Sequence, residues 1–150
     1  MAPGEMTREE LIRTELGKLY SGNVVDHAMH PRNMKEMADA DGYAKITGPC
    51  GDTMEIWLSV RNDTISEASF LTDGCVTSVA AGSMAVEMAG GRSVTGAMKI
   101  SQQDVLTALD GLPEDSEHCA LLAANTLKAA LRDYLSIKRE PWKKGYRKYQ

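Results

Sequence analysis

Three cysteines, two of them with a second metal-binding side chain close by, are the residues best suited to chemistry in this chain. Cys50 stands two residues before Asp52, Cys119 directly follows His118, and Cys75 is the third thiol. Three thiolates with one oxygen or nitrogen donor make a four-coordinate soft site suited to Zn²⁺ or an iron–sulfur cluster. Stable clusters usually have four cysteines, so a cluster held by three would be bound less tightly.

Other interpretations of the cysteines stay open at this point, because the chain has no CxxC and no zinc-finger spacing. A free cysteine often behaves as a small buried hydrophobe. A Cys–His hydrolase would use His118 to activate a thiol, but adjacent helical residues point about 100° apart, which places His118 poorly for Cys119. A purely structural zinc site would be closed and buried, which the turn at 49–51 and a carboxylate ligand do not favour.

The residues between these thiols predict the elements that position them. Helical spacing of apolar residues predicts a helix over 7–19, a break at Ser21–Gly22 and a second helix to Met29. Alternation with period two over 42–71 then predicts three short antiparallel strands, the last two joined by a hairpin turn. Each cysteine therefore falls where an element begins or ends, and such boundaries can converge at one end of a sheet.

Helices are expected after the strands. The patterns predict a helix in the run 75–91, which ends on paired glycines, a second over 101–109, and a last long helix capped by Asp115 or Ser116 that runs to about Ile137. The expected fold class is α+β, with a small three-stranded antiparallel sheet covered by helices on one face. Cys75 and Cys119 would lie at helix N-termini, where the positive end of the helix dipole favours thiolate.

Composition limits the classes of partner. The 150 residues carry 17 Lys+Arg against 21 Asp+Glu, a net charge of −4, so no nucleic-acid partner is expected. No apolar run approaches the roughly 18 residues of a membrane span, and the acidic N-terminal segment does not resemble a targeting sequence. We expect a cytoplasmic protein with free thiols, no membrane partner and a basic C-terminal tail over 138–150.

Four motifs, in this order, resemble those of the iron–sulfur cluster assembly scaffolds of the IscU and NifU N-terminal type. YSGNVVDHAMHPRNM is similar to the N-terminal signature of that family, and GPCGD, DGCVTSVAAGS and EHCALLAANTLKAALRDY resemble its three cysteine motifs. The resemblance extends over about residues 20–137. It leaves residues 1–19 as an N-terminal extension, which we expect to be helical.

The resemblance implies a function and a set of site residues. The family's members are scaffolds and not enzymes: a cysteine desulfurase delivers sulfur, iron is supplied, and a labile [2Fe–2S] cluster is assembled and passed to apo-proteins. Carried over by motif, Cys50, Cys75 and Cys119 correspond to ligand and sulfur-accepting cysteines. Asp52 and His118 correspond to the family's aspartate and histidine at the metal site. Zn²⁺ or Fe²⁺ would suit the apo form, and iron or electron donor proteins are further partners; homo-oligomerisation is left open.

One departure qualifies the resemblance, and one alternative function stays open. Where many members have an LPPVK chaperone-recognition motif, this chain has LPEDS over 112–116, which puts docking of an Hsp70-type chaperone in doubt. The alternative function is a zinc-bound sulfur acceptor of the SufU type, which would use the same ligands. That type carries an insertion between the second and third cysteine motifs, and no such insertion is obvious here.

Overall fold

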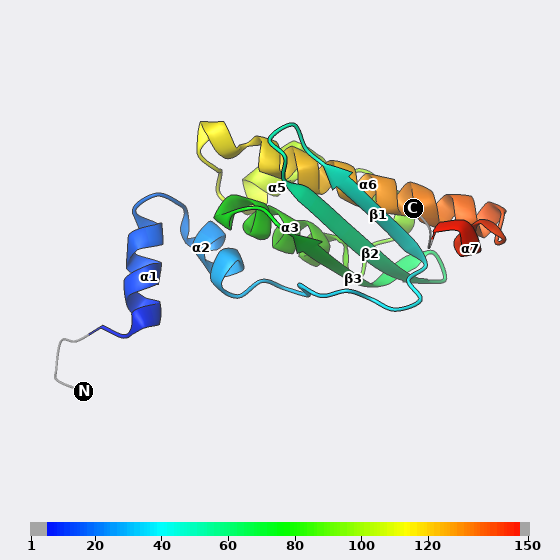
Figure 1. The fold of residues 1–150 in the computed structure, drawn as a ribbon, viewed down its shortest axis with the longest axis horizontal. Helices are drawn as coiled ribbons and strands as arrows, with labels where there is room; N and C mark the ends of the chain where they lie inside the picture. Colours follow the sequence, from blue (N-terminus) through cyan, green and yellow to red (C-terminus); the bar gives the residue numbers. More distant parts are fainter. Residues whose placement is uncertain (1–5, 148–150) are drawn as a thin grey trace.

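The computed structural model describes residues 6–147, and their side chains as far as residue 145. The chain forms three strands and a set of helices around one hydrophobic core (Figure 1). The elements in chain order are α1 (Arg8–Gly17), α2 (Gly22–Met29), β1 (Gly42–Thr47), β2 (Thr53–Arg61), β3 (Thr64–Thr72), α3 (Val76–Ala89), α4 (Val94–Ala97), α5 (Gln102–Ala108), the 3₁₀ turn η1 (Glu114–Ser116), α6 (His118–Arg139) and α7 (Lys143–Arg147).

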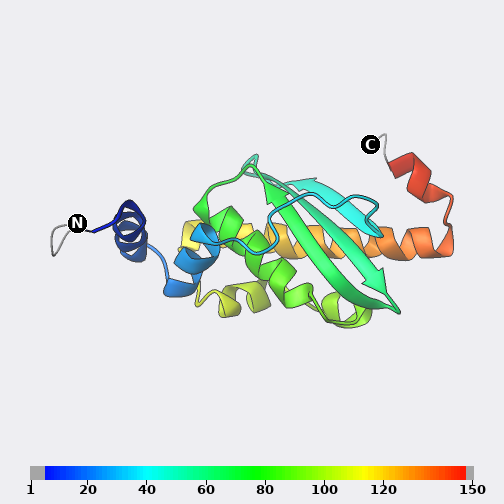
Figure 2. The same cartoon turned by 90° about the horizontal axis from the view of Figure 1, so that it is seen from below.

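The sheet is antiparallel with strand order β1-β2-β3. Its β2–β3 hairpin turns through Asn62 and Asp63, whose φ values of 53° and 57° are those of the tight turn that matches the twist of two strands. Figures 1 and 2 show α3 and α6 on one side of the sheet, with the other side free of helices. The expected α+β fold, with three antiparallel strands covered by helices on one face, is confirmed.

Alternate side chains of the strands build the core beneath these helices. Met54, Ile56 and Leu58 of β2 point to the same face, and all are fully buried. Gly82 lets α3 approach the sheet closely, because a Cβ at that position would stand 2.5 Å from a ring carbon of Phe70 on β3. This close contact fixes α3, and with it the thiol at its N-terminus, against the strands.

Side chains cap both N-terminal helices. Thr7 and Glu10 form a capping box at α1, and Ser21 caps α2 through the backbone N–H of Val24. Helix α1 buries none of its side chains and projects from the rest of the molecule (Figure 2). By contrast, α2 packs against α3 and contributes the fully buried Val24 to the core.

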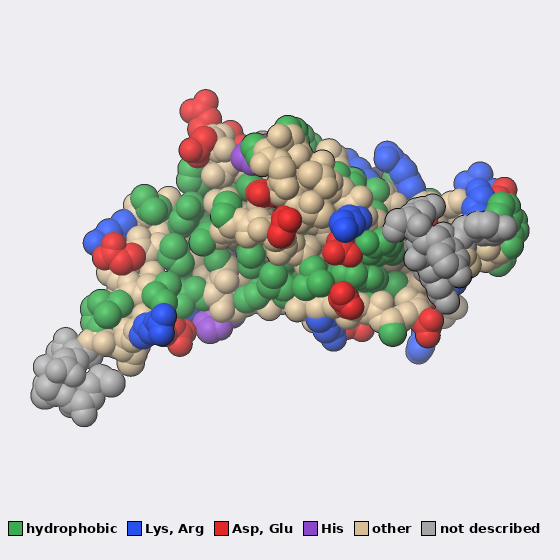
Figure 3. Space-filling model, viewed as in Figure 1, with side chains coloured by type: hydrophobic (Ala, Val, Ile, Leu, Met, Phe, Trp, Pro, Cys, Tyr) green, Lys and Arg blue, Asp and Glu red, His purple; other side chains and the backbone are tan. Residues whose placement is uncertain are grey.

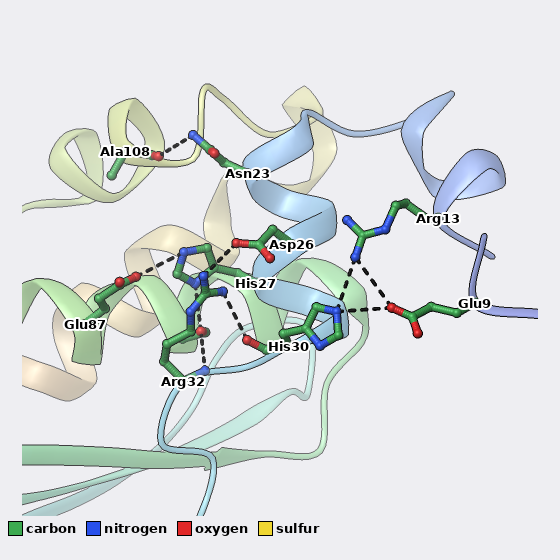
Figure 4. Close-up of polar contacts among 10 residues, drawn as sticks. Glu9, Arg13, Asn23, Asp26, His27, His30, Arg32, Glu87 and Ala108 are labelled. Atoms are coloured by element: carbon green, nitrogen blue, oxygen red, sulfur yellow. Dashed lines mark hydrogen bonds and ion pairs between the residues drawn. The ribbon is translucent and has the colours of Figure 1, made fainter. Parts of the chain in front are cut away.

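Polar contacts hold α2 in place (Figure 4). His27 is buried between Ser83 and Glu87 of α3, 2.7 Å and 3.1 Å away, and Ser83 also accepts the backbone N–H of Arg32 at 2.8 Å. On the far side of α2, His30 lies 3.3 Å from Glu9 of α1. One histidine thus joins α2 to the core, and the other joins it to the exposed helix.

The start of the last long helix differs from the prediction. Asp115 and Ser116, expected as its caps, lie in η1 instead, and α6 begins at His118 after Glu117, which makes no side-chain capping bond. Pro113 is the N-cap of η1, and the Ser116 N–H donates to the Pro113 carbonyl at 2.8 Å, which closes this turn before α6 begins. Helix α6 then runs to Arg139, so the boundary of 138 expected for the basic tail falls in its last turn, and residues 148–150 lie outside the described part.

Two short elements, α4 and α7, were not expected from the sequence. Helix α4 has only four residues and is capped by Ser93, which accepts from the backbone N–H of Gly96. None of the helices in residues 6–147 has the length and apolarity needed to cross a bilayer.

Candidate functional site

The segments that carry the three cysteines meet at one end of the sheet. Figure 1 shows the β1–β2 turn close to the first turns of α3 and α6 at that end. The segments meet because the strands are antiparallel: the turn after β1 and the last residues of β3 lie at the same end of the sheet. At the same corner, acidic side chains of η1 project into solvent (Figure 3).

Cys50 lies on the β1–β2 turn, and its side chain is exposed. The turn is closed by hydrogen bonds from the Gly48 N–H to the Asp52 carbonyl, 2.8 Å, and from the Gly51 N–H to the Gly48 carbonyl, 3.0 Å. Gly51 has φ of +87°, a conformation that glycine adopts without steric cost. The turn therefore presents Cys50 outward and places the carboxylate of Asp52 next to Ser78 in the first turn of α3.

Cys75 occupies the N-cap position of α3 and is also exposed. Its Sγ lies 3.2 Å from Oγ1 of Thr77. This hydrogen bond and those from the backbone N–H groups of Thr77 and Ser78 lower the pKa of the Cys75 thiol, against the opposing effects of burial and of the Asp52 charge. The expected helix N-terminal environment is therefore present, and it favours the thiolate.

Cys119 differs from the other two thiols because it is 1% exposed. Its Sγ is surrounded by polar atoms: Oγ1 of Thr77 at 3.3 Å, Oγ of Ser78 at 3.5 Å and Nε2 of His118 at 3.7 Å. The expectation that His118 is poorly placed for Cys119 is wrong, since the two side chains are in contact. His118 is the first residue of α6, and its ring folds along the helix start so that Nε2 reaches Cys119 Sγ.

The side chains of Asp52, His118 and Cys119 each place one possible ligand atom within 4.8 Å of the others. The Asp52 carboxylate also accepts a hydrogen bond of 3.0 Å from Ser78 Oγ. A carboxylate oxygen, an imidazole nitrogen and a thiolate are all ligands that Zn²⁺ and iron accept. The chemistry of this donor set fits a metal ion of that kind.

The structure brings four of the five predicted site residues together. The Cys75 and Cys119 sulfurs both contact Thr77 Oγ1, so they are at most 6.5 Å apart, the sum of the two distances. Cys50 is not part of the group of three possible ligands; it stands on the adjoining turn. Sequence reasoning missed Thr77 and Ser78, although both lie inside the second cysteine motif and a hydroxyl two or three residues after an N-cap thiol is a usable signal.

Comparisons with known proteins match most of the chain. The family model described as NifU-like N terminal domain matches residues 19–141. Iron-sulfur cluster assembly scaffold protein IscU 1 of Archaeoglobus fulgidus is 43% identical over 117 residues, which cover 77% of this chain and 76% of that protein. Iron-sulfur cluster assembly enzyme IscU of Drosophila melanogaster is 38% identical over 121 residues, covering 77% and 78%.

A solved structure shares the fold. The N-terminal part of a nitrogen-fixing NifU-like protein from Brucella abortus superposes with a TM-score of 0.63 over 81% of this chain and 97% of that chain. Its sequence is 16% identical to this one.

Proposed function

Since this chain belongs to the NifU-like N-terminal domain family, we propose that it is a scaffold on which a [2Fe–2S] cluster is assembled and then passed to apo-proteins. The cluster is the protein's cargo, and the chain is a carrier rather than an enzyme. The observation that supports this most directly is the meeting of Cys75, Cys119 and Asp52 around two buried hydroxyls at one end of the sheet.

In this proposal the three cysteines are the thiolate ligands. Cys75 and Cys119 are within 6.5 Å of each other, as the distances to Thr77 require, and Cys50 joins them from the glycine-containing turn. Asp52 or His118 provides the fourth ligand, since both place a donor atom near Cys119. A fourth ligand with a hard oxygen is displaced more easily by an incoming thiolate than a fourth cysteine would be, which suits a cluster that is given away.

The proposed partners follow from this chemistry. A cysteine desulfurase provides sulfur to Cys50, Cys75 or Cys119. Donor proteins provide iron or electrons, and apo iron–sulfur proteins accept the finished cluster. All three thiols are free, and a cytoplasmic, reducing location would keep them so. Zn²⁺ or Fe²⁺ would occupy the site when no cluster is present. An Hsp70-type chaperone is a doubtful partner, because Glu114, Asp115 and Ser116 stand where the recognition motif has Pro, Val and Lys.

Anaerobic reconstitution tests this function. The apo protein is incubated with Fe²⁺, cysteine, a cysteine desulfurase and a dithiol reductant that reduces the persulfide sulfur to sulfide, and the visible spectrum and the iron-to-sulfide ratio are measured. We expect the absorption of a [2Fe–2S] cluster, equal amounts of iron and acid-labile sulfide, and transfer of the cluster to an apo-ferredoxin. Replacing Cys75 or Cys119 by serine should abolish the stable cluster but leave the fold intact, because a hydroxyl is a much poorer ligand for iron.

The zinc-bound sulfur acceptor is the competing function, and the same experiment separates the two. That function predicts one tightly bound Zn²⁺ per chain, sulfur recovered as persulfide on a cysteine when the dithiol is omitted, and no acid-labile sulfide. Such a result would overturn the scaffold proposal.

A further inference from the structure

One oxygen atom contacts two of the thiols. Thr77 Oγ1 lies 3.2 Å from Cys75 Sγ and 3.3 Å from Cys119 Sγ, although the two cysteines come from different helices. The Thr77 side chain is 1% exposed, so water is largely excluded from it. A buried hydroxyl needs hydrogen-bond partners, and both partners of the Thr77 hydroxyl are sulfur atoms.

The next residue continues this arrangement on the other side of Cys119. Ser78 Oγ donates to the Asp52 carboxylate at 3.0 Å and stands 3.5 Å from Cys119 Sγ. Ser78 is fully buried. The first turn of α3 thus provides two consecutive hydroxyls, one between two thiols and one between a thiol and a carboxylate.

The chemistry of a hydroxyl defines what Thr77 can do here. It has one proton to donate and two lone pairs, so between two thiols it can accept from one and donate to the other. When both sulfurs are thiolates, which only accept, its proton goes to one of them. Hydrogen bonds of this kind orient metal ligands and tune the reduction potential of a cluster.

We propose that Thr77 is a positioning residue for the cluster: its hydroxyl bridges the Cys75 and Cys119 sulfurs in the apo protein, and it donates a hydrogen bond to one ligating thiolate when the metal is bound. The inference rests on the proposed function. Thr77 itself is not the metal ligand in this proposal, because a neutral hydroxyl is a much poorer ligand for iron than the two thiolates beside it. Its hydroxyl sets the spacing at which those sulfurs meet the metal.

Cobalt binding to the full-length apo protein tests this under anaerobic conditions. Co²⁺ is titrated into wild type, Thr77→Val, Thr77→Ala and Thr77→Ser, and the thiolate-to-cobalt charge-transfer absorption is followed. Loss of a residue that supports a metal ligand typically weakens metal binding about 10- to 100-fold. We expect a loss of that size in the valine and alanine variants and affinity close to wild type in the serine variant, which keeps the hydroxyl.

Thr126→Val is the matched control. Thr126 is also a fully buried helical threonine, but its hydroxyl bonds the Leu122 carbonyl at 2.7 Å and does not contact a thiol. Its loss should lower the melting temperature and leave cobalt affinity unchanged. If Thr126→Val weakened cobalt binding as much as Thr77→Val, the effect would be one of general stability and the positioning role would be rejected.

The reduction potential of the reconstituted cluster provides a second readout. A hydrogen bond to a ligand sulfur stabilises the more negative, reduced cluster, so the potential of Thr77→Val should become more negative while that of Thr77→Ser stays near wild type. Unchanged cobalt affinity and unchanged potential in Thr77→Val, with a normal cluster in wild type, would overturn this inference alone. Wild type that shows no thiolate–cobalt absorption and assembles no cluster would overturn the proposed function as well.

Discussion

His27 Nδ1 on α2 lies 2.7 Å from Ser83 Oγ on α3. The other hydrogen-bond partners of the two residues decide which ring nitrogen of His27 is protonated and where the Ser83 hydroxyl proton points. Nε2 of His27 is 3.1 Å from the Glu87 carboxylate, which can only accept, so Nε2 bears the proton. Ser83 Oγ already accepts from the Arg32 N–H, and its own proton points to Nδ1. The neutral imidazole therefore satisfies every partner.

Acidification should destabilise the protein through His27. Burial lowers the pKa of His27 below its usual 6.5, with Arg32 adding to the shift and Glu87 and Asp26 opposing it. The unfolded chain then binds the proton more readily than the folded one, so stability is full above pH 6.5 and falls as the pH drops toward the folded-state pKa. Each unit of pKa depression corresponds to about 1.4 kcal/mol. Urea denaturation between pH 7.5 and 5.5 measures this loss.

Two variants assign that pH dependence. His27→Gln removes the titrating ring and should flatten the curve of unfolding free energy against pH, even if it lowers stability throughout. His30→Gln removes a 55% exposed ring of the same helix, which contacts Glu9, and should keep the wild-type slope. An undiminished slope in His27→Gln would show that another group is responsible.

The three thiols should react with an alkylating reagent in two classes. Cys50 and Cys75 are exposed, whereas Cys119 is 1% exposed. In the apo protein we expect rapid modification of the first two and slow modification of Cys119, because the reagent reaches Cys119 only when the structure opens locally. Mass spectrometry of timed samples measures the three rates. In urea all three should react alike, and equal rates in the folded protein would contradict the burial of Cys119.

The sequence predicts the elements well where local chemistry decides them. The capping boxes of Thr7 and Ser101 are both formed, and the Asn62–Asp63 turn closes the expected hairpin, since these signals depend on residues close together in the chain. From the sequence, Cys119 could be either a buried hydrophobic residue or a residue of the site. The structure makes it both buried and surrounded by polar partners, because its position depends on how α6 packs against α3.

Other features depend on long-range contacts and have only faint local signals. His27 is three residues from the buried Val24, a spacing that places both on one helical face, but nothing in the sequence names Ser83 as its partner. In the same way, Thr77 and Ser78 stand inside a recognised motif, yet their contacts to Cys119 and Asp52 join residues from three separate segments.

Gly74→Ala should disturb the site more than its small size suggests. A Cβ at Gly74 would lie 2.6 Å from Ser78 Cβ and 2.9 Å from Asp52 Oδ2, so the Ser78–Asp52 hydrogen bond would have to shift. We expect Co²⁺ affinity to fall about 10-fold or more, because the variant loses the hydrogen bond by which Ser78 orients the Asp52 carboxylate. Gly48→Ala is the control, because its Cβ would make only ordinary contacts, with Leu122 at 3.6 Å and with the Asp52 carbonyl oxygen at 3.8 Å. Equal affinities of the two variants would mean that the site tolerates the displacement.

Asp52 should control how easily the cluster leaves. If its carboxylate is the exchangeable ligand, Asp52→Ala removes the hard donor that an incoming thiolate displaces, and the cluster should live longer and pass more slowly to an apo-ferredoxin. If Asp52 serves only as a partner for Ser78, alanine should lower stability by about 1 kcal/mol and leave transfer unchanged.

Asp41→Ala is the matched control for this prediction, since the Asp41 carboxylate accepts a backbone N–H from Val60 at 2.8 Å and lies outside the thiol cluster. It should lower the melting temperature without altering transfer. Asp52→Asn adds a further distinction, because an amide oxygen still accepts the proton of Ser78 but carries no negative charge to offer iron. Slow transfer in both Asp52 variants with normal transfer in Asp41→Ala assigns the effect to the carboxylate as a ligand. Normal transfer in Asp52→Asn, with slow transfer in Asp52→Ala, would assign it to the hydrogen bond with Ser78.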